Sequence, residues 1–150
     1  MIKTILSVLM SAFLFGCATT NTVSQNTNVR HDAKVSIVKF AFDSSKLNAN
    51  SKTTLNNVVA ANNEKYGKDY VMAVVGRTDY VASNEYNNDL GMRRAKHVSA
   101  YLKEKGVTVT FVQSMGESDP VVIEPYIAQN FDNIAVRETN RSVTLITLHR

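Results

Sequence analysis

The stretch from Gly76 to Ala95, GRTDYVASNEYNNDLGMRRA, combines a helical pattern with polar side chains where a buried helix face is expected. Counting about 100° of rotation per residue from Asn87 onward, the apolar positions fall on one arc and the charged positions mostly on the other. Asn87 and Arg94 interrupt the apolar arc. A guanidinium there needs an anion or several acceptors. Either Arg94 reaches the rim or an internal carboxylate, or it binds an anionic ligand.

A short buried strand is predicted just before this helix. Residues 70–75 are rich in Val and are followed by a glycine. Thr78 and Asp79 therefore lie at the carboxyl end of a strand, where open sheets commonly bind ligands. They also suit a turn, because an Asp side chain readily bonds its own backbone two residues on. Together with Arg94, they would form a site with charges of both signs.

At these residues the chain resembles the OmpA-like domain family, a peptidoglycan-associated module of outer-membrane porins, Pal-type lipoproteins and flagellar motor proteins. The family pattern is G-H-T-D followed by Y-N-x-x-L-S-x-R-R-A. The positions in register are Gly76, Thr78, Asp79, Tyr86, Asn87, Leu90, Arg93, Arg94 and Ala95. Flanking motifs agree at Phe40, Phe42 and Asp43, at Gly116, Glu117 and Pro120, and at Asn140, Arg141 and Val143. The resemblance spans about residues 35–148.

Three positions depart from the family pattern. Arg77 replaces a His, Gly91 replaces a Ser, and Ser142 replaces the second Arg of N-R-R-V. Gly91 is expected to weaken the helix by about 1 kcal/mol relative to Ala, and Arg77 to add positive charge beside the pocket. These changes leave the expected fold intact and bear on the details of the ligand site.

The resemblance implies a ligand, the diaminopimelate residue of the peptidoglycan stem peptide. It implies that Arg94 takes the carboxylate of this amino acid and that Asp79 accepts from its ammonium or from amide groups. Asn87 would complete the peptide contacts or hold the loop in place. Weaker candidates are Thr78 and Asp43, together with Leu90. Such binding needs no bond cleavage and no cofactor, so we expect a binding protein rather than an enzyme.

The N-terminus resembles a bacterial lipoprotein signal. Residues 1–16 contain one early lysine and an apolar run from Ile5 to Phe15 that is too short to span a bilayer. Cys17 follows and is the only cysteine, so no disulfide can form within the chain. Lipid attachment gives this cysteine a role. Phe15 is larger than usual at its position, which leaves an ordinary signal peptide or a buried apolar N-terminus as alternatives.

A tether is predicted between the lipid anchor and the domain. Residues 17–32 comprise Cys17 and a stretch dominated by Thr, Asn, Ser and Gln, which cannot bury a core and is expected to be disordered. As a flexible coil it would reach about 20 Å. Ala18, rather than Asp, favours sorting to the outer membrane. We therefore expect a lipid-anchored outer-membrane protein with its domain, residues 33–150, in the periplasm.

The domain is predicted to be α+β, a two-layer sandwich with a mixed four-stranded sheet and two main helices on one face, in the order β-α-β-α-β-β. Expected strands are residues 35–42, 70–75, 107–115 and 142–148. One helix is expected over residues 49–66, capped by Asn48 or Asn50, and another contains Arg94 and ends at Gly106. Residues 121–139 show no clear period, and a short helix is expected around Ile127.

Other chemistries find little support in the composition. The three histidines lack the spacing of metal ligands, and no phosphate-binding loop or nucleophile motif is present. The net charge of +4 is modest and dispersed without interleaved aromatic residues, which argues against nucleic acid as a partner.

Two functions follow from the sequence. The first is an outer-membrane lipoprotein that binds peptidoglycan noncovalently and tethers the outer membrane to the cell wall. The second is a structural or docking subunit of an envelope-spanning machine, such as a secretion or conjugation system or a flagellar motor. The first is the favoured function. The departures at Arg77 and Ser142, the short tether and the segment 121–139 suit the second better than a generic wall anchor would.

Lipid attachment is testable at Cys17. We expect Cys17→Ser to abolish incorporation of labelled palmitate and to release the protein from the membrane fraction, because the acyl chains supply the anchoring energy. Membrane fractionation of wild type and variant measures this. Continued tight membrane association of the variant would contradict a lipid anchor.

Overall fold

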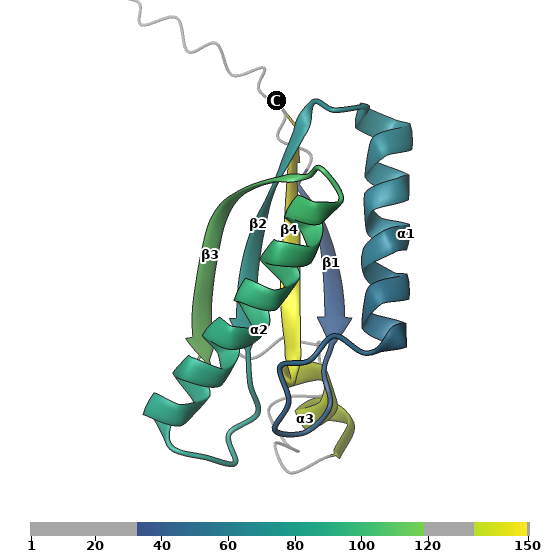
Figure 1. Cartoon of the computed structure of the whole chain (residues 1–150). Helices are drawn as coiled ribbons and strands as arrows, with labels where there is room; N and C mark the ends of the chain where they lie inside the picture. Colours follow the sequence, from purple (N-terminus) through teal and green to yellow (C-terminus); the bar gives the residue numbers. More distant parts are fainter. Residues whose placement is uncertain (1–32, 119–133, 150) are drawn as a thin grey trace, which may run out of the picture.

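The computed structural model describes residues 33–118 and 134–149 and shows a four-stranded sheet covered by helices (Figure 1). The elements are β1 (Lys34–Lys39), α1 (Ala49–Tyr66), β2 (Tyr70–Arg77), α2 (Asn84–Glu104), β3 (Thr108–Gly116), α3 (Ile134–Asn140) and β4 (Ser142–His149). The predicted α+β order is confirmed, with α3 added before the last strand. The expected signal peptide, the tether over 17–32 and the helix around Ile127 lie outside the described residues.

The strands lie in the order β1-β4-β2-β3, so the last strand of the chain is inserted between the first two. β4 is antiparallel to both β1 and β2, whereas β2 and β3 are parallel. A parallel pair needs a crossover connection, and α2 provides it. Val143 of β4 lies opposite Val38 of β1 and Gly76 of β2. The sheet is therefore mixed, as predicted.

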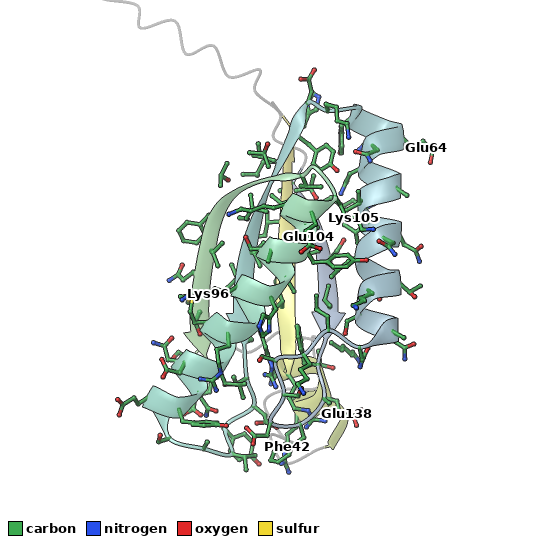
Figure 2. The ribbon with its side chains drawn as sticks, viewed as in Figure 1. Phe42, Glu64, Lys96, Glu104, Lys105 and Glu138 are labelled. Carbon is green, nitrogen blue, oxygen red and sulfur yellow. The ribbon has the colours of Figure 1, made fainter. Side chains whose placement is uncertain are left out.

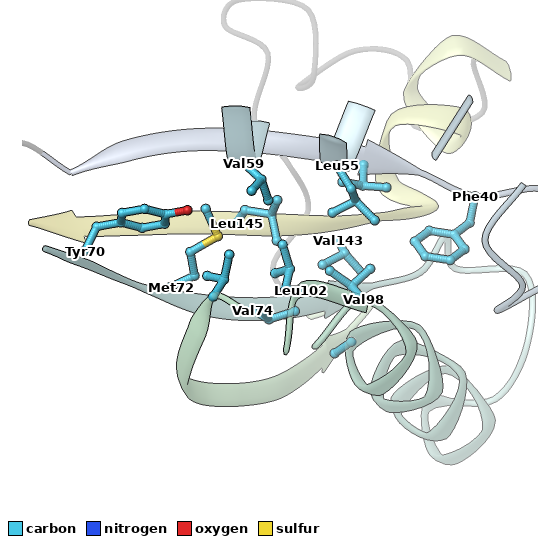
Figure 3. Packing of buried hydrophobic residues seen from close by; sticks show 13 residues of the cluster. Phe40, Leu55, Val59, Tyr70, Met72, Val74, Val98, Leu102, Val143 and Leu145 are labelled. Carbon is cyan, nitrogen blue, oxygen red and sulfur yellow. The ribbon is translucent and has the colours of Figure 1, made fainter. Parts of the chain in front are cut away.

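Both long helices pack on the same face of the sheet. Lys96 and Glu104 remain exposed on the outer side of α2 (Figure 2). Alternate residues of the strands point into the core between sheet and helices. Figure 3 shows this cluster, to which the strands contribute Tyr70, Met72, Val74, Val143 and Leu145, α1 contributes Leu55 and Val59, and α2 contributes Val98 and Leu102.

The opening strand is shorter than predicted. β1 ends at Lys39 rather than at Phe42. Beyond it, the Phe40 N–H still donates to the Arg141 carbonyl at 2.7 Å, but Asp43 adopts a φ of 48° and the chain turns toward α1. Asp is one of the few residues that tolerates this left-handed conformation without large cost. The turn places Phe42 and Asp43 in a loop at the end of the sheet.

The helices begin at capping side chains. Of the two candidate caps of α1, Asn48 is the one used, because its Oδ1 accepts from the Ser51 N–H at 2.9 Å. α2 begins at Asn84, where Ser83 is the cap, because Ser83 Oγ accepts from the Tyr86 N–H at 3.3 Å.

α2 crosses the sheet where two glycines meet. A Cβ on Gly76 would lie 1.9 Å from the carbonyl oxygen of Gly91, and a Cβ on Gly91 would lie 2.3 Å from Ser114 Oγ. The Gly76 contact is with backbone, so the close approach of α2 to β2 requires glycine at position 76, whereas Gly91 leaves room for the Ser114 side chain on β3, and a Cβ there would lie 3.3 Å from the Gly76 carbonyl oxygen. The departure at Gly91 is therefore a packing feature as well as a weak point of the helix.

This contact predicts an unusual response to mutation. Helix propensity alone would make Gly91→Ala stabilising by about 1 kcal/mol. We instead expect the free energy of unfolding to fall by about 1–3 kcal/mol, because the new methyl group overpacks the contact with Ser114 and Gly76. Urea unfolding measures this difference.

A double-mutant cycle with Ser114→Gly isolates the clash. Since the shortest contact exists only when both side chains are present, the double variant should lose less than the sum of the single variants. A stabilised Gly91→Ala protein would contradict the packing explanation.

Candidate functional site

A pocket lies where the carboxyl ends of β1 and β2 meet the start of α2. Its volume is about 180 Å³, and its lining residues are Phe42, Asp43, Asp79, Val81, Ala82, Tyr86, Asn87 and Leu90. Figure 2 shows Phe42 at this end of the molecule. Of the predicted site residues, the fold brings Asp43, Asp79, Asn87 and Leu90 together here. Thr78 and Arg94 are not among the lining residues.

Asp79 is a buried carboxylate held by two arginines. It is 7% exposed, and its Oδ2 lies 3.2 Å from Arg141 Nη1 and 3.8 Å from Arg137 Nε. A buried carboxylate is stable only with such partners, so the two arginines offset the cost of burying Asp79 in the pocket wall. Sequence reasoning assigned no site role to either arginine. Arg141 could have been noticed in its N-R motif, whereas Arg137 falls in a segment without a clear period.

The second carboxylate, Asp43, is fixed by Tyr86. The Tyr86 hydroxyl donates to Asp43 Oδ1, and this hydrogen bond raises the pKa of the Tyr86 hydroxyl. The left-handed backbone of Asp43 turns its side chain toward α2. An uncommon backbone conformation at a pocket is a frequent mark of a functional position.

Arg94 is 1% exposed and binds backbone carbonyls from two segments. Its Nε donates to Ser44 O at 2.8 Å, its Nη1 to Arg77 O at 2.9 Å and its Nη2 to Ala41 O at 3.2 Å. Within the described residues, no ion pair joins Arg94 directly to Asp79. Burial lowers the pKa of Arg94 to about 10, so the guanidinium stays charged at neutral pH. Several acceptors, rather than one carboxylate, therefore satisfy the arginine that interrupts the apolar arc.

Asn87 lines the pocket and Thr78 lies behind its lining. Asn87 is 2% exposed, and its Nδ2 donates to Ala82 O at 3.2 Å and to Glu117 Oε2 at 2.6 Å. Asn87 thus joins the loop before α2 to the end of β3. Thr78 is buried, its N–H donates to Gly116 O at 2.9 Å, and its Oγ1 has no hydrogen-bond partner among residues 33–118 and 134–149.

Comparison with known proteins identifies the family. A model described as the OmpA family matches residues 39–133. The chain belongs to the OmpA family. Outer membrane protein A of Escherichia fergusonii is 33% identical over 94 residues, which are 61% of this chain and 39% of the relative. Outer membrane protein A of Klebsiella aerogenes is 32% identical over 102 residues, which are 67% of this chain and 28% of the relative. The chain spans less than half the length of these relatives.

Solved structures share the OmpA-like fold. The peptidoglycan-associated lipoprotein from Burkholderia pseudomallei aligns with a TM-score of 0.58 at 24% identity, over 74% of this chain and 88% of that one. The C-terminal domain of Helicobacter pylori MotB aligns with a TM-score of 0.60 at 22% identity, over 75% of this chain and 83% of that one. The sandwich predicted from the sequence is thus the OmpA-like fold.

Two departures from the OmpA-like pattern lie away from the pocket lining. Arg77 Nη1 donates to Thr144 Oγ1 at 2.7 Å. Thr144 lies between the core residues Val143 and Leu145 on β4, so it faces away from the helices. The expectation that Arg77 adds charge beside the pocket is therefore wrong, because this contact directs its side chain to the opposite face of the sheet. Ser142 is fully buried at the start of β4.

The hydrogen bonds of Arg94 predict that replacing this residue strongly destabilises the OmpA-like domain. Arg94→Lys keeps the charge but loses the planar fork, so carbonyls at Ala41, Ser44 or Arg77 lose their donors. We expect the free energy of unfolding to fall by about 2–4 kcal/mol. Arg93→Ala is the matched control, because Arg93 is the exposed neighbour on the same helix, and it should cost less than about 0.5 kcal/mol. Urea unfolding followed by circular dichroism compares them, and equal losses would refute the role of Arg94.

Proposed function

We propose that this OmpA-like domain binds peptidoglycan noncovalently through the diaminopimelate of the stem peptide. The observation that carries the proposal is the pocket in which the carboxylates of Asp43 and Asp79 lie close to the buried guanidinium of Arg94 and the partly buried guanidinium of Arg141. Diaminopimelate presents an ammonium and a carboxylate on one carbon. A site with both charges complements it, and no step in this binding breaks a covalent bond.

Each charge of the ligand has an assigned partner. The ammonium is placed against Asp79, with Asp43 as the second acceptor, because both carboxylates line the pocket. The family resemblance assigns the ligand carboxylate to Arg94, which keeps two N–H groups beyond its three carbonyl bonds but lies behind the pocket lining and is 1% exposed. Arg94 has a second role, because it fixes the loop that carries Asp43. Its loss would impair folding and binding together, so Arg94 variants do not test binding cleanly.

We also propose that the protein is an outer-membrane lipoprotein, anchored through Cys17 and facing the periplasm. Support comes from the direction of β1, which starts at Lys34 and leads toward the pocket end of the sheet (Figure 1). The pocket thus lies at the opposite end of the sheet from Lys34, an arrangement that suits a domain anchored on its N-terminal side and binding the wall at its far end. No helix in the described part of the chain is long and apolar enough to cross a membrane.

A second candidate is docking within an envelope-spanning machine. It is favoured by an apolar surface that wall binding does not use. Val35 and Phe111 are 60% and 50% exposed, and the strand register places them in one row with Ile146 and Ala73 across the sheet face away from the helices. Ile146 is partly exposed and Ala73 is buried, so the exposed part of the row is carried by Val35 and Phe111 at its two ends. Exposed apolar side chains of this kind often mark protein interfaces.

The peptidoglycan proposal predicts selective competition. The full chain should sediment with purified sacculi, and a soluble stem tetrapeptide containing meso-diaminopimelate should release it. The same tetrapeptide with lysine at that position has a free side-chain ammonium but no free carboxylate beside it, so it cannot accept the charged hydrogen bonds of an arginine there and should require at least about tenfold higher concentration. This comparison uses unmodified protein, so it is independent of any effect on folding.

Asp79→Asn provides the matching variant. It keeps an oxygen for Arg141 but removes the charge that holds the ammonium, and it should weaken sedimentation by about tenfold or more. Asp89→Asn on the exposed face of α2 is the control and should sediment like wild type. If wild type fails to sediment, or if Asp79→Asn binds equally well, peptidoglycan binding through this pocket is wrong and the docking function takes its place.

A further inference from the structure

Large apolar side chains are exposed around the mouth of the pocket. Phe42, Tyr80, Val81 and Tyr86 are between 41% and 58% exposed, and three of them also line the pocket. In the described chain, the other large exposed apolar residues are Val35 and Phe111 on the far sheet face. We call these four residues the aromatic rim. An exposed apolar cluster bordering a polar pocket is typical of a ligand surface.

Each ring of the aromatic rim has an arginine beside it. The guanidinium carbon of Arg141 lies 5.9 Å from the centre of the Phe42 ring, and the Tyr80 and Tyr86 rings have Arg137 at 5.8 Å and Arg93 at 5.7 Å. Such cation–π contacts favour a defined ring position. Arg137 and Arg141 are themselves held by Asp79. Two of the rings are thus fixed by the same ion pairs that form the pocket wall.

A polar groove lies on the other side of the first turn of α2. It has a volume of about 420 Å³ and combines amides, hydroxyls and carboxylates, among them Asn84, Glu85, Asn88, Glu117 and Ser118. Asn87 connects it to the pocket, because its Nδ2 bonds Glu117. Amides and carboxylates of this kind can donate to and accept from sugar hydroxyls.

We propose that the aromatic rim stacks on sugar rings of the glycan strand that carries the bound stem peptide, with the polar groove bonding the sugar hydroxyls. The inference rests on the proposed binding of the stem peptide. One face of a pyranose ring presents C–H bonds, which pack on the electron-rich face of an aromatic ring. Its hydroxyls point outward and need polar partners. Rigid half-exposed rings beside a groove of amides and carboxylates match both requirements.

Tyr80 allows the rim to be tested apart from the pocket, because it borders the pocket without lining it. The probes are a disaccharide-tetrapeptide containing diaminopimelate and the same tetrapeptide without sugars, titrated calorimetrically into the full chain. Tyr80→Ser should weaken binding of the disaccharide-tetrapeptide by about threefold to tenfold and leave binding of the tetrapeptide unchanged. Asn88→Ala should act in the same direction on the groove side.

Phe111→Ser is the matched control, because Phe111 is equally exposed on the far face of the sheet. It should change neither affinity. Saturation-transfer NMR adds a direct readout, since transfer from aromatic protons to sugar C–H protons should be reduced in Tyr80→Ser and unchanged in Phe111→Ser.

The outcomes separate the two proposals. If wild type binds both probes equally, or if Tyr80→Ser affects both probes or neither, the sugar contact is wrong while stem-peptide binding stands. If wild type binds neither probe, the proposed function fails and the rim proposal fails with it. In that case the same exposed rings would be tested as a protein-docking surface.

Discussion

The fold around the pocket depends on one buried cation. Arg94 enters the protein from α2 and donates to the carbonyls of Ala41 and Ser44 in the loop after β1 and of Arg77 at the end of β2. Taking a guanidinium out of water is costly unless its donors are satisfied. Because those donors are satisfied by backbone of fixed position, Arg94 fixes the loop relative to the sheet and thereby the position of Asp43.

A second group of charged residues, Asp79, Arg137 and Arg141, forms ion pairs at the same end of the sheet. Asp79 sits beyond the end of β2 and binds Arg141 and Arg137, which come from the end of the described chain. The short helix α3 and the return of β4 to the middle of the sheet bring these cations to the pocket. The carboxylates face the pocket and the cations stand behind them, so a ligand with both charges meets the acid first. The same cations also lie beside Phe42 and Tyr80.

Sequence reasoning predicted much of this and missed specific parts. Hydrophobic periodicity located both long helices and all four strands, because a helix or strand that buries one face has apolar residues at regular spacing along the chain. It also singled out Asn87 and Arg94, because polar residues on an apolar arc are costly. It overextended β1 to Phe42, because the left-handed turn at Asp43 leaves no periodic signal. It also placed Arg77 beside the pocket, although the alternation of the strand sends its side chain to the opposite face.

The sequence by itself determined the fold class, the family and the residue types of the pocket, because these depend on local patterns and motif register. Only the tertiary structure decided which partners each charge has. Arg94 bonds carbonyls about 17 to 53 positions away along the chain, Asp79 meets arginines from α3 and the start of β4, and Gly91 meets Gly76. Contacts between such distant segments follow from the strand order and from where the helix crosses the sheet. Neither can be predicted from the residues of a single segment.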